Sequence, residues 1–197
     1  ATDALIDAII DWRDKNETPE AEGAETLYYE DLEPPYKAKN GPIEKLEELL
    51  FVKGITADLL EEWTIYLTVY GEGKVNINTA SRDILVFLGM NASLVDQIME
   101  FRSGPDMIDG TEDDRNFTDE SAIAKTLFEY EPLMPNEVSL LTNLVSQKLL
   151  GVQSKVFRIE SLGIPYKNIN NCYKIVCIVK HEGGDDFEIL SWQEFKQ

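Results

Sequence analysis

The fold is decided by residues 75–102, VNINTASRDILVFLGMNASLVDQIMEFR, which predict a strand-like entry and two short helices joined by a tight hairpin. We expect Thr79 to cap the first helix, because its hydroxyl can accept hydrogen bonds from the free amides of the first turn. Gly89 stands where a positive φ closes a helix, and Met90 is expected to fill the hairpin from inside. The pattern is that of a helix-hairpin-helix unit.

The net charge of the chain disfavours binding of nucleic-acid phosphate, the usual ligand of such units. The sequence holds 37 acidic and 18 basic residues, a formal net charge of -19, and this field repels a polyanion. Asn91 and Thr56 also stand where a second glycine is usual in such turns. We therefore expect the hairpins to serve packing, with no nucleic-acid partner. The acidic balance suits metal ions or basic protein surfaces, or serves solubility alone.

The remaining sequence predicts an α+β fold. A weaker hairpin pattern at residues 49–56 precedes the first, and together they predict a compact helical block over residues 43–102. We expect residues 1–150 to form a large helical domain with two helix-hairpin-helix, or SAM-like, units. Residues 151–197 are expected to form a small antiparallel sheet. Helices are predicted at 3–14, 43–51, 57–69, 81–88, 92–102, 119–127 and 136–150, and strands at 155–161, 173–180 and 187–192.

The middle strand of this sheet is apolar on both faces, and each face then needs cover. The helix ending near Leu150 supplies one cover. We expect the other from chain that precedes Ala1 or from a neighbouring subunit, because the sequence opens without an initiator Met and directly on a helix-like run. No apolar run in the 197 residues approaches the ~20 residues of a membrane helix.

Two acidic segments are candidate sites for Ca²⁺, a hard cation that takes six to eight oxygen ligands, as a rough guide. Short loops with glycine turns let several carboxylates converge on such an ion. The alternative for both segments is a solvated acidic loop. The first set is Asp106, Asp109, Glu112, Asp113 and Asp114; the second is Asp14, Asn16, Glu22 and Glu25 around Gly23.

Catalysis and partner binding are less clearly marked. The single histidine, His181, has no Ser or Cys motif that places a nucleophile near it, so we expect no enzyme. The apolar side of the first helix, with Leu5, Ile9 and Trp12, is a candidate partner interface, and ordinary core is the alternative.

Several motifs resemble the protein K family of type II secretion minor pseudopilins, and their order along the chain is more specific than any one of them. They are ALID at 4–7 with DW at 11–12, GAE at 23–25 before YY at 28–29, PPY at 34–36, KNGP at 39–42, ELL at 48–50, VKGI at 52–55, VNINTA at 75–80, FRI at 157–159 and ILSW at 189–192.

The resemblance implies a non-enzymatic assembly protein with a pseudopilin sheet. It implies the minor pseudopilins GspI and GspJ as partners at the tip of a periplasmic pseudopilus, and an inner-membrane anchor helix outside this sequence. Related proteins hold calcium, which favours Ca²⁺ at the acidic segments. The alternative is an acidic protein-binding adaptor module unrelated to secretion.

Overall fold

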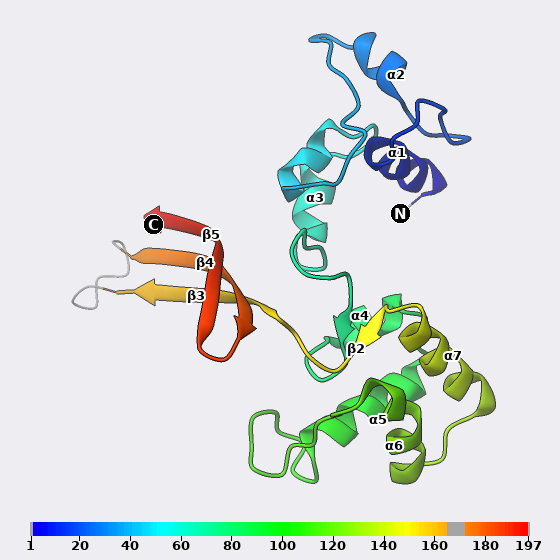
Figure 1. Ribbon diagram of the computed structural model, residues 1–197, viewed down its shortest axis with the longest axis vertical. Coiled ribbons are helices and arrows are strands. Elements are labelled where there is room, and N and C mark those ends of the chain that lie inside the picture. Colours follow the sequence, from blue (N-terminus) through cyan, green and yellow to red (C-terminus); the bar gives the residue numbers. More distant parts are fainter. Residues whose placement is uncertain (1, 165–171, 197) are drawn as a thin grey trace. The chain divides into compact units, whose positions relative to one another are not determined.

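The computed structural model of the chain describes residues 2–164 and 172–196, and it divides them into two compact units (Figure 1). The first unit is Ala1–Val69 and the second is Tyr70–Gln197. The division falls inside residues 43–102, so each compact unit contains one of the two predicted hairpin segments. It also differs from the predicted domain boundary at 150, because the second unit combines helices with the sheet.

The first unit is built around one aromatic core. Its elements are α1 (Asp3–Arg13), α2 (Thr26–Glu30), the 3-10 helix η1 (Leu46–Phe51) and α3 (Ala57–Trp63). Trp12 and Tyr29 meet edge to face, with ring centroids 5.2 Å apart, and Tyr36 stacks on Tyr29 at 5.2 Å. The fully buried Tyr29 therefore ties the irregular segment 15–42 to α1. The core residues are Ala8, Trp12, Ala24, Tyr29, Leu49, Val52, Ile55 and Leu60.

Two predicted helices of this unit are corrected. The segment expected as a helix at 43–51 is only the 3-10 turn η1, and α3 ends at Trp63 rather than Val69. Both segments are short. Isolated helices of such length are only marginally stable, so tertiary packing decides which conformation they adopt. The structure also adds α2, within a segment that was expected to be irregular.

The helices of the second unit follow the predicted pattern closely. They are α4 (Arg82–Phe87), α5 (Ala92–Ser103), η2 (Glu120–Ala122), α6 (Ile123–Tyr130) and α7 (Pro135–Ser146). Gly89 takes the expected positive φ of 86°, and Met90 is buried. The predicted cap is corrected, because Ser81 rather than Thr79 accepts a hydrogen bond from the first turn, from the Ile84 amide at 3.4 Å.

The start of residues 75–102 holds two other segments in place through strand pairing and through the hydrogen bonds of Asn78, here called the Asn78 clamp. Strand β1 (Val75–Asn76) pairs in parallel with β2 (Leu150–Gly151). Just after it, the Asn78 Nδ2 donates to the carbonyl oxygens of Phe117 at 2.8 Å and Val152 at 2.9 Å, while its Oδ1 accepts from the Phe117 amide at 2.8 Å. One amide side chain thus joins segments that lie 39 and 74 residues away.

Replacing Asn78 by Ala is expected to lower the free energy of unfolding by about 2 kcal/mol, because partly buried backbone groups lose their partners. Urea unfolding measures the effect. Ser146→Ala, which removes one exposed hydrogen bond at the end of α7, is the control. An Asn78→Ala protein as stable as this control would show that the clamp adds nothing.

The sheet is antiparallel in the order β3-β4-β5, as predicted, with β3 (Val156–Gly163), β4 (Tyr173–Gly183) and β5 (Asp186–Lys196) side by side (Figure 1). Phe157 pairs with Val179, and Ile189 pairs with Val179 from the other side. Residues in register share a face. This face, here called the aromatic face, carries six side chains that are each at least 45% exposed: Phe157, Ile159, Tyr173, Phe187, Ile189 and Trp192.

The α+β class is therefore confirmed, with helices in both units and one small antiparallel sheet in the second. None of the helices in residues 2–164 and 172–196 has the length and apolar character needed to cross a membrane.

Candidate cation site

Three carboxylates converge in the first unit. Oxygen atoms of Asp11, Asp14 and Glu25 all lie within 4.8 Å of one another. Asp11 is on the last turn of α1, Asp14 caps the end of that helix, and Glu25 is the residue before α2. The chain reversal at residues 15–24 therefore brings two helix ends to one point.

Glu25 is the most informative member of the group. It is only 4% exposed, and neither of its carboxylate oxygens has a hydrogen-bond partner. Burial, together with the negative charges of Asp11, Glu17 and Asp14, raises the pKa of Glu25 from 4.5 to about 7. A buried carboxylate without a donor is costly unless a proton or a cation neutralises it.

Asp11 is fixed more tightly. It is fully buried, and its Oδ1 accepts a hydrogen bond from the Glu20 amide at 3.1 Å. Gly23 lies directly against it, because a Cβ built on Gly23 would stand 1.9 Å from the Asp11 Oδ2. Glycine at this position is what lets the loop close over the carboxylate.

Asp14, a member of the group, and Glu17, a nearby carboxylate outside it, are both held by hydrogen bonds. Asn16 holds Asp14 through two hydrogen bonds, from its backbone amide at 3.0 Å and its side-chain amide at 2.8 Å. Glu17 accepts from the Thr26 hydroxyl at 3.1 Å and the Thr26 amide at 3.3 Å. Both ends of the loop are thus tied around the carboxylates, which gives them a defined geometry.

The donor set fits a hard divalent cation. Carboxylate oxygens are the ligands that Ca²⁺ and Mg²⁺ take, and the larger Ca²⁺ accepts irregular geometry. The unpartnered oxygens of Glu25 are a positive sign of fit, because an ion would supply the interaction that the protein does not. Bound there, a cation would hold α1 and the start of α2 together.

The sequence predicted two of the three members of this group. It named Asp14 and Glu25, and the structure brings them together. Asn16 instead supports Asp14, and Glu22 donates its backbone amide to Asp7 at 3.0 Å. The missed member is Asp11, which stood in the sequence as a carboxylate three residues after the core residue Ala8, on the face of α1 that packs inward.

The acidic loop at 104–117 does not form a comparable group. Its carboxylates accept from donors of the same loop, such as Asp114 from the Gly110 amide at 2.7 Å and Asp113 from the Thr111 hydroxyl at 2.7 Å. Within residues 2–164 and 172–196, no three acidic side chains of this loop approach one another as Asp11, Asp14 and Glu25 do. Metal binding by Asp106, Asp109, Glu112, Asp113 and Asp114 stays a prediction.

The residues of the candidate interface on α1 pack on the core of the first unit, and a partner contact by Leu5, Ile9 and Trp12 stays a prediction. Trp12 is 5% exposed, and Leu5 and Ile9 pack against the same core. The apolar side chains that α1 does expose are Ile6 and Ile10.

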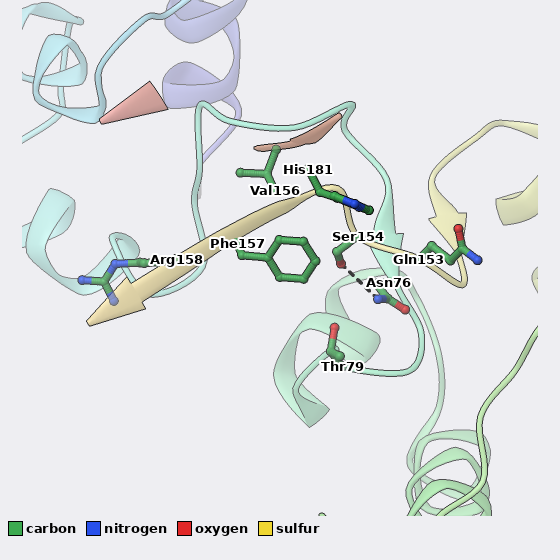
Figure 2. Close-up of a pocket in the computed structure, with 8 residues that line it drawn as sticks. All are labelled: Asn76, Thr79, Gln153, Ser154, Val156, Phe157, Arg158 and His181. Atoms are coloured by element: carbon green, nitrogen blue, oxygen red, sulfur yellow. Dashed lines mark hydrogen bonds between the residues drawn. The ribbon is translucent and has the colours of Figure 1, made fainter. Parts of the chain in front are cut away.

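The single histidine lines a surface pocket of about 550 Å³ in the second unit. Figure 2 shows Thr79 and Phe157 beside this pocket, the Asn76 amide bonded to the Ser154 hydroxyl at 3.0 Å, and Arg158 pointing away. The Nε2 of His181 is 3.0 Å from the carbonyl oxygen of Gly184. His181 therefore has a structural partner in its own turn, and among the residues that the structure describes no Ser or Cys is bonded to its ring.

Comparisons with known proteins agree with the resemblance seen in the sequence. Residues 1–72 match the family model described as type II secretion system (T2SS), protein K. The chain is 41% identical over 78 residues to the type II secretion system protein K of Aeromonas hydrophila, covering 38% of this chain and 24% of the relative. It is 30% identical over 77 residues to the putative protein K of Escherichia coli K12, covering 39% of this chain and 24% of that relative.

The fold has a solved counterpart. A chain in the crystal structure of the GspK-GspI-GspJ complex from enterotoxigenic Escherichia coli matches with a TM-score of 0.61 and 16% identity, over 98% of this chain and 63% of that one. The alignments span about a quarter of the length of the curated relatives.

Over its first 72 residues, the chain is therefore similar to components of type II secretion systems. Within that class, residues 1–72 match the model of the protein K family, which confirms the resemblance seen in the sequence.

Proposed function

We propose that this chain acts as a minor pseudopilin of a type II secretion system, assembling with GspI and GspJ at the periplasmic tip of the pseudopilus. The observation that carries the proposal is the protein K family match over the first unit. The fold it shares with a chain of the GspK-GspI-GspJ complex supports it over nearly the whole length. The role is one of protein contact rather than catalysis.

The aromatic face of the sheet supports an assembly role. Six large apolar side chains exposed on one three-stranded sheet exceed the scattered exposure usual on a monomer, and such patches mark protein contacts. The opposite face of the sheet carries paired charges, with Glu160 bridging to Arg158 and, at 2.7 Å, to Lys174. An apolar surface of a partner pseudopilin would cover the aromatic face.

We also propose that the Asp11, Asp14 and Glu25 group binds Ca²⁺ and so fixes the first unit for assembly. Support comes from the unpartnered oxygens of Glu25 and from the tight closure of the loop around Asp11. Co-purification with GspI and GspJ, with and without Ca²⁺, tests both proposals. Failure to co-purify in either condition would favour the adaptor alternative.

Trp192→Ser is expected to weaken association with the partner pseudopilins by about 30-fold, the effect of losing one buried aromatic anchor. The matched control is Phe195→Ser, which removes an exposed aromatic side chain from the same strand but from the opposite face. Surface plasmon resonance measures both. Equal losses in the two variants would remove the aromatic face from the interface.

A further inference from the structure

One polar atom near the candidate cation site remains unexplained. The Oδ1 of Asn40 is buried and has no hydrogen-bond partner. Two other Asn side chains do have a partner for this atom. The Oδ1 of Asn78 accepts a hydrogen bond from the Phe117 amide, and the Oδ1 of Asn91 accepts one from the Leu94 amide. A buried acceptor left alone is destabilising by about 1 to 3 kcal/mol, so its persistence in a fixed position calls for a ligand.

The orientation of the Asn40 amide follows from its neighbour. Its Nδ2 donates to the Glu17 Oε1 at 2.7 Å. A carboxylate only accepts hydrogen bonds, so the amide nitrogen must face Glu17 and the oxygen must face elsewhere. The backbone of Asn40 has a φ of 49°, a left-handed conformation that Asn adopts more readily than most residues. Glu17 and the backbone together hold the side chain in this orientation.

Glu17 connects Asn40 to the cation site. The same Oε1 that accepts from Asn40 also accepts from the hydroxyl of Thr26, the residue that follows Glu25. The charge of Glu17 is close enough to Glu25 to contribute to the raised pKa of that carboxyl. Two hydrogen bonds through Glu17 therefore link Asn40 to the residue next to Glu25, although Asn40 comes from a segment 15 residues beyond Glu25.

We propose that the Oδ1 of Asn40 is a further, neutral ligand of the cation held by Asp11, Asp14 and Glu25, with Glu17 as the residue that positions it. Side-chain amide oxygens are ordinary ligands of Ca²⁺. A neutral oxygen adds to the coordination number without adding to the repulsion among three carboxylates. This inference rests on the proposed cation site and extends it, because the ion would then also bind the segment that leads to Gly41 and Pro42.

Two substitutions of Asn40 distinguish the effect of its side-chain oxygen from the effect of its backbone conformation. Asn40→Gly removes the side chain and tolerates the left-handed conformation without strain, whereas Asn40→Asp keeps an oxygen at the same place and loses the donor to Glu17. Isothermal titration of chelator-treated protein with Ca²⁺ measures affinity, and thermal unfolding without Ca²⁺ reports any loss of fold. We expect Asn40→Gly to bind Ca²⁺ about tenfold more weakly and Asn40→Asp to stay within about threefold of wild type.

The outcomes are distinguishable. Wild-type affinity in Asn40→Gly would overturn the role of Asn40 and leave the carboxylate site intact. Equal weakening in both variants would show that the donor to Glu17 matters rather than the oxygen, and would also overturn it. A wild-type protein that binds no Ca²⁺ would overturn the cation site and this inference together.

Discussion

Glu25→Gln is expected to abolish the response of the first unit to Ca²⁺ and to make the ion-free protein more stable at pH 8. A carboxyl whose pKa rises from 4.5 to about 7 carries an ionisation penalty on the order of 3 kcal/mol. The variant removes that penalty, since a neutral amide replaces the buried anion. It also removes the ligand, so added Ca²⁺ no longer raises the melting temperature.

The wild-type protein should lose stability as pH rises without the ion, and lose less of it with the ion. Without Ca²⁺, the native state keeps the Glu25 proton up to about pH 7, whereas the unfolded chain releases it near pH 4.5. The native state then binds more protons between these values, so its stability falls as pH rises through the window. With Ca²⁺, the ion binds the ionised carboxylate and offsets the fall.

Urea unfolding at pH 5 and pH 8, each with EDTA and with Ca²⁺, gives the measurement. Glu22→Gln is the matched control, because this acidic residue of the same loop is exposed and outside the converging group. It should retain the wild-type response to Ca²⁺ and to pH. Wild-type stability that is indifferent to both Ca²⁺ and pH across this window would contradict the site.

The hairpin between α4 and α5 was predictable because its signals are local. Gly89 supplies a conformation that few other residues adopt, and the apolar spacing of α5 continues over three turns. The hairpin at residues 49–56 was harder to predict, since η1 and α3 are short and packing on Trp12 and Tyr29 decides their conformation. The cap is Ser81 rather than Thr79 because the amides of Thr79 and Ala80 close a turn on the Asn76 carbonyl oxygen, and α4 begins only at Arg82.

The candidate cation site could be predicted only in part from the sequence. Asp14 and Glu25 could be named because they flank a glycine loop, whereas Asp11 belongs to a helix whose inward face is defined only by tertiary packing. The loop at 104–117 has the denser acidic sequence, yet its own amides and the Thr111 hydroxyl occupy its carboxylates. Acidic density in the sequence therefore does not by itself predict which carboxylates converge in the structure.

The sheet illustrates a different limit. Alternation predicted its three strands and their antiparallel order, but the register contains a bulge, since Ile178 pairs with Ser191 while Val179 pairs with Ile189. The bulge puts Trp192 and Ile189 on the same face although they are three residues apart. Strict alternation cannot predict this arrangement, and it is what makes the aromatic face continuous along β5.

Gly23→Ala is expected to reduce Ca²⁺ affinity by at least about 100-fold and the free energy of unfolding by about 1 to 3 kcal/mol, the usual range for overpacking. The new methyl carbon would stand 1.9 Å from the Asp11 Oδ2 and 2.7 Å from its Cγ. An exposed carboxylate could rotate away, but Asp11 is fully buried and held by the Glu20 amide. It can make room only by leaving the other two carboxylates.

The loop cannot retreat easily either, because the Lys53 ammonium donates to the carbonyl oxygens of Glu22 and Gly23, both at 3.0 Å. Gly41→Ala is the control, since its methyl carbon would meet the Lys39 carbonyl oxygen at an ordinary 3.7 Å. Calorimetric titration and urea unfolding compare the two, and equal Ca²⁺ affinity would contradict the argument. The Gly-Ala-Glu motif at 23–25 thus acquires a physical meaning: Gly23 admits Asp11, Ala24 fills the core, and Glu25 supplies the unpartnered carboxylate.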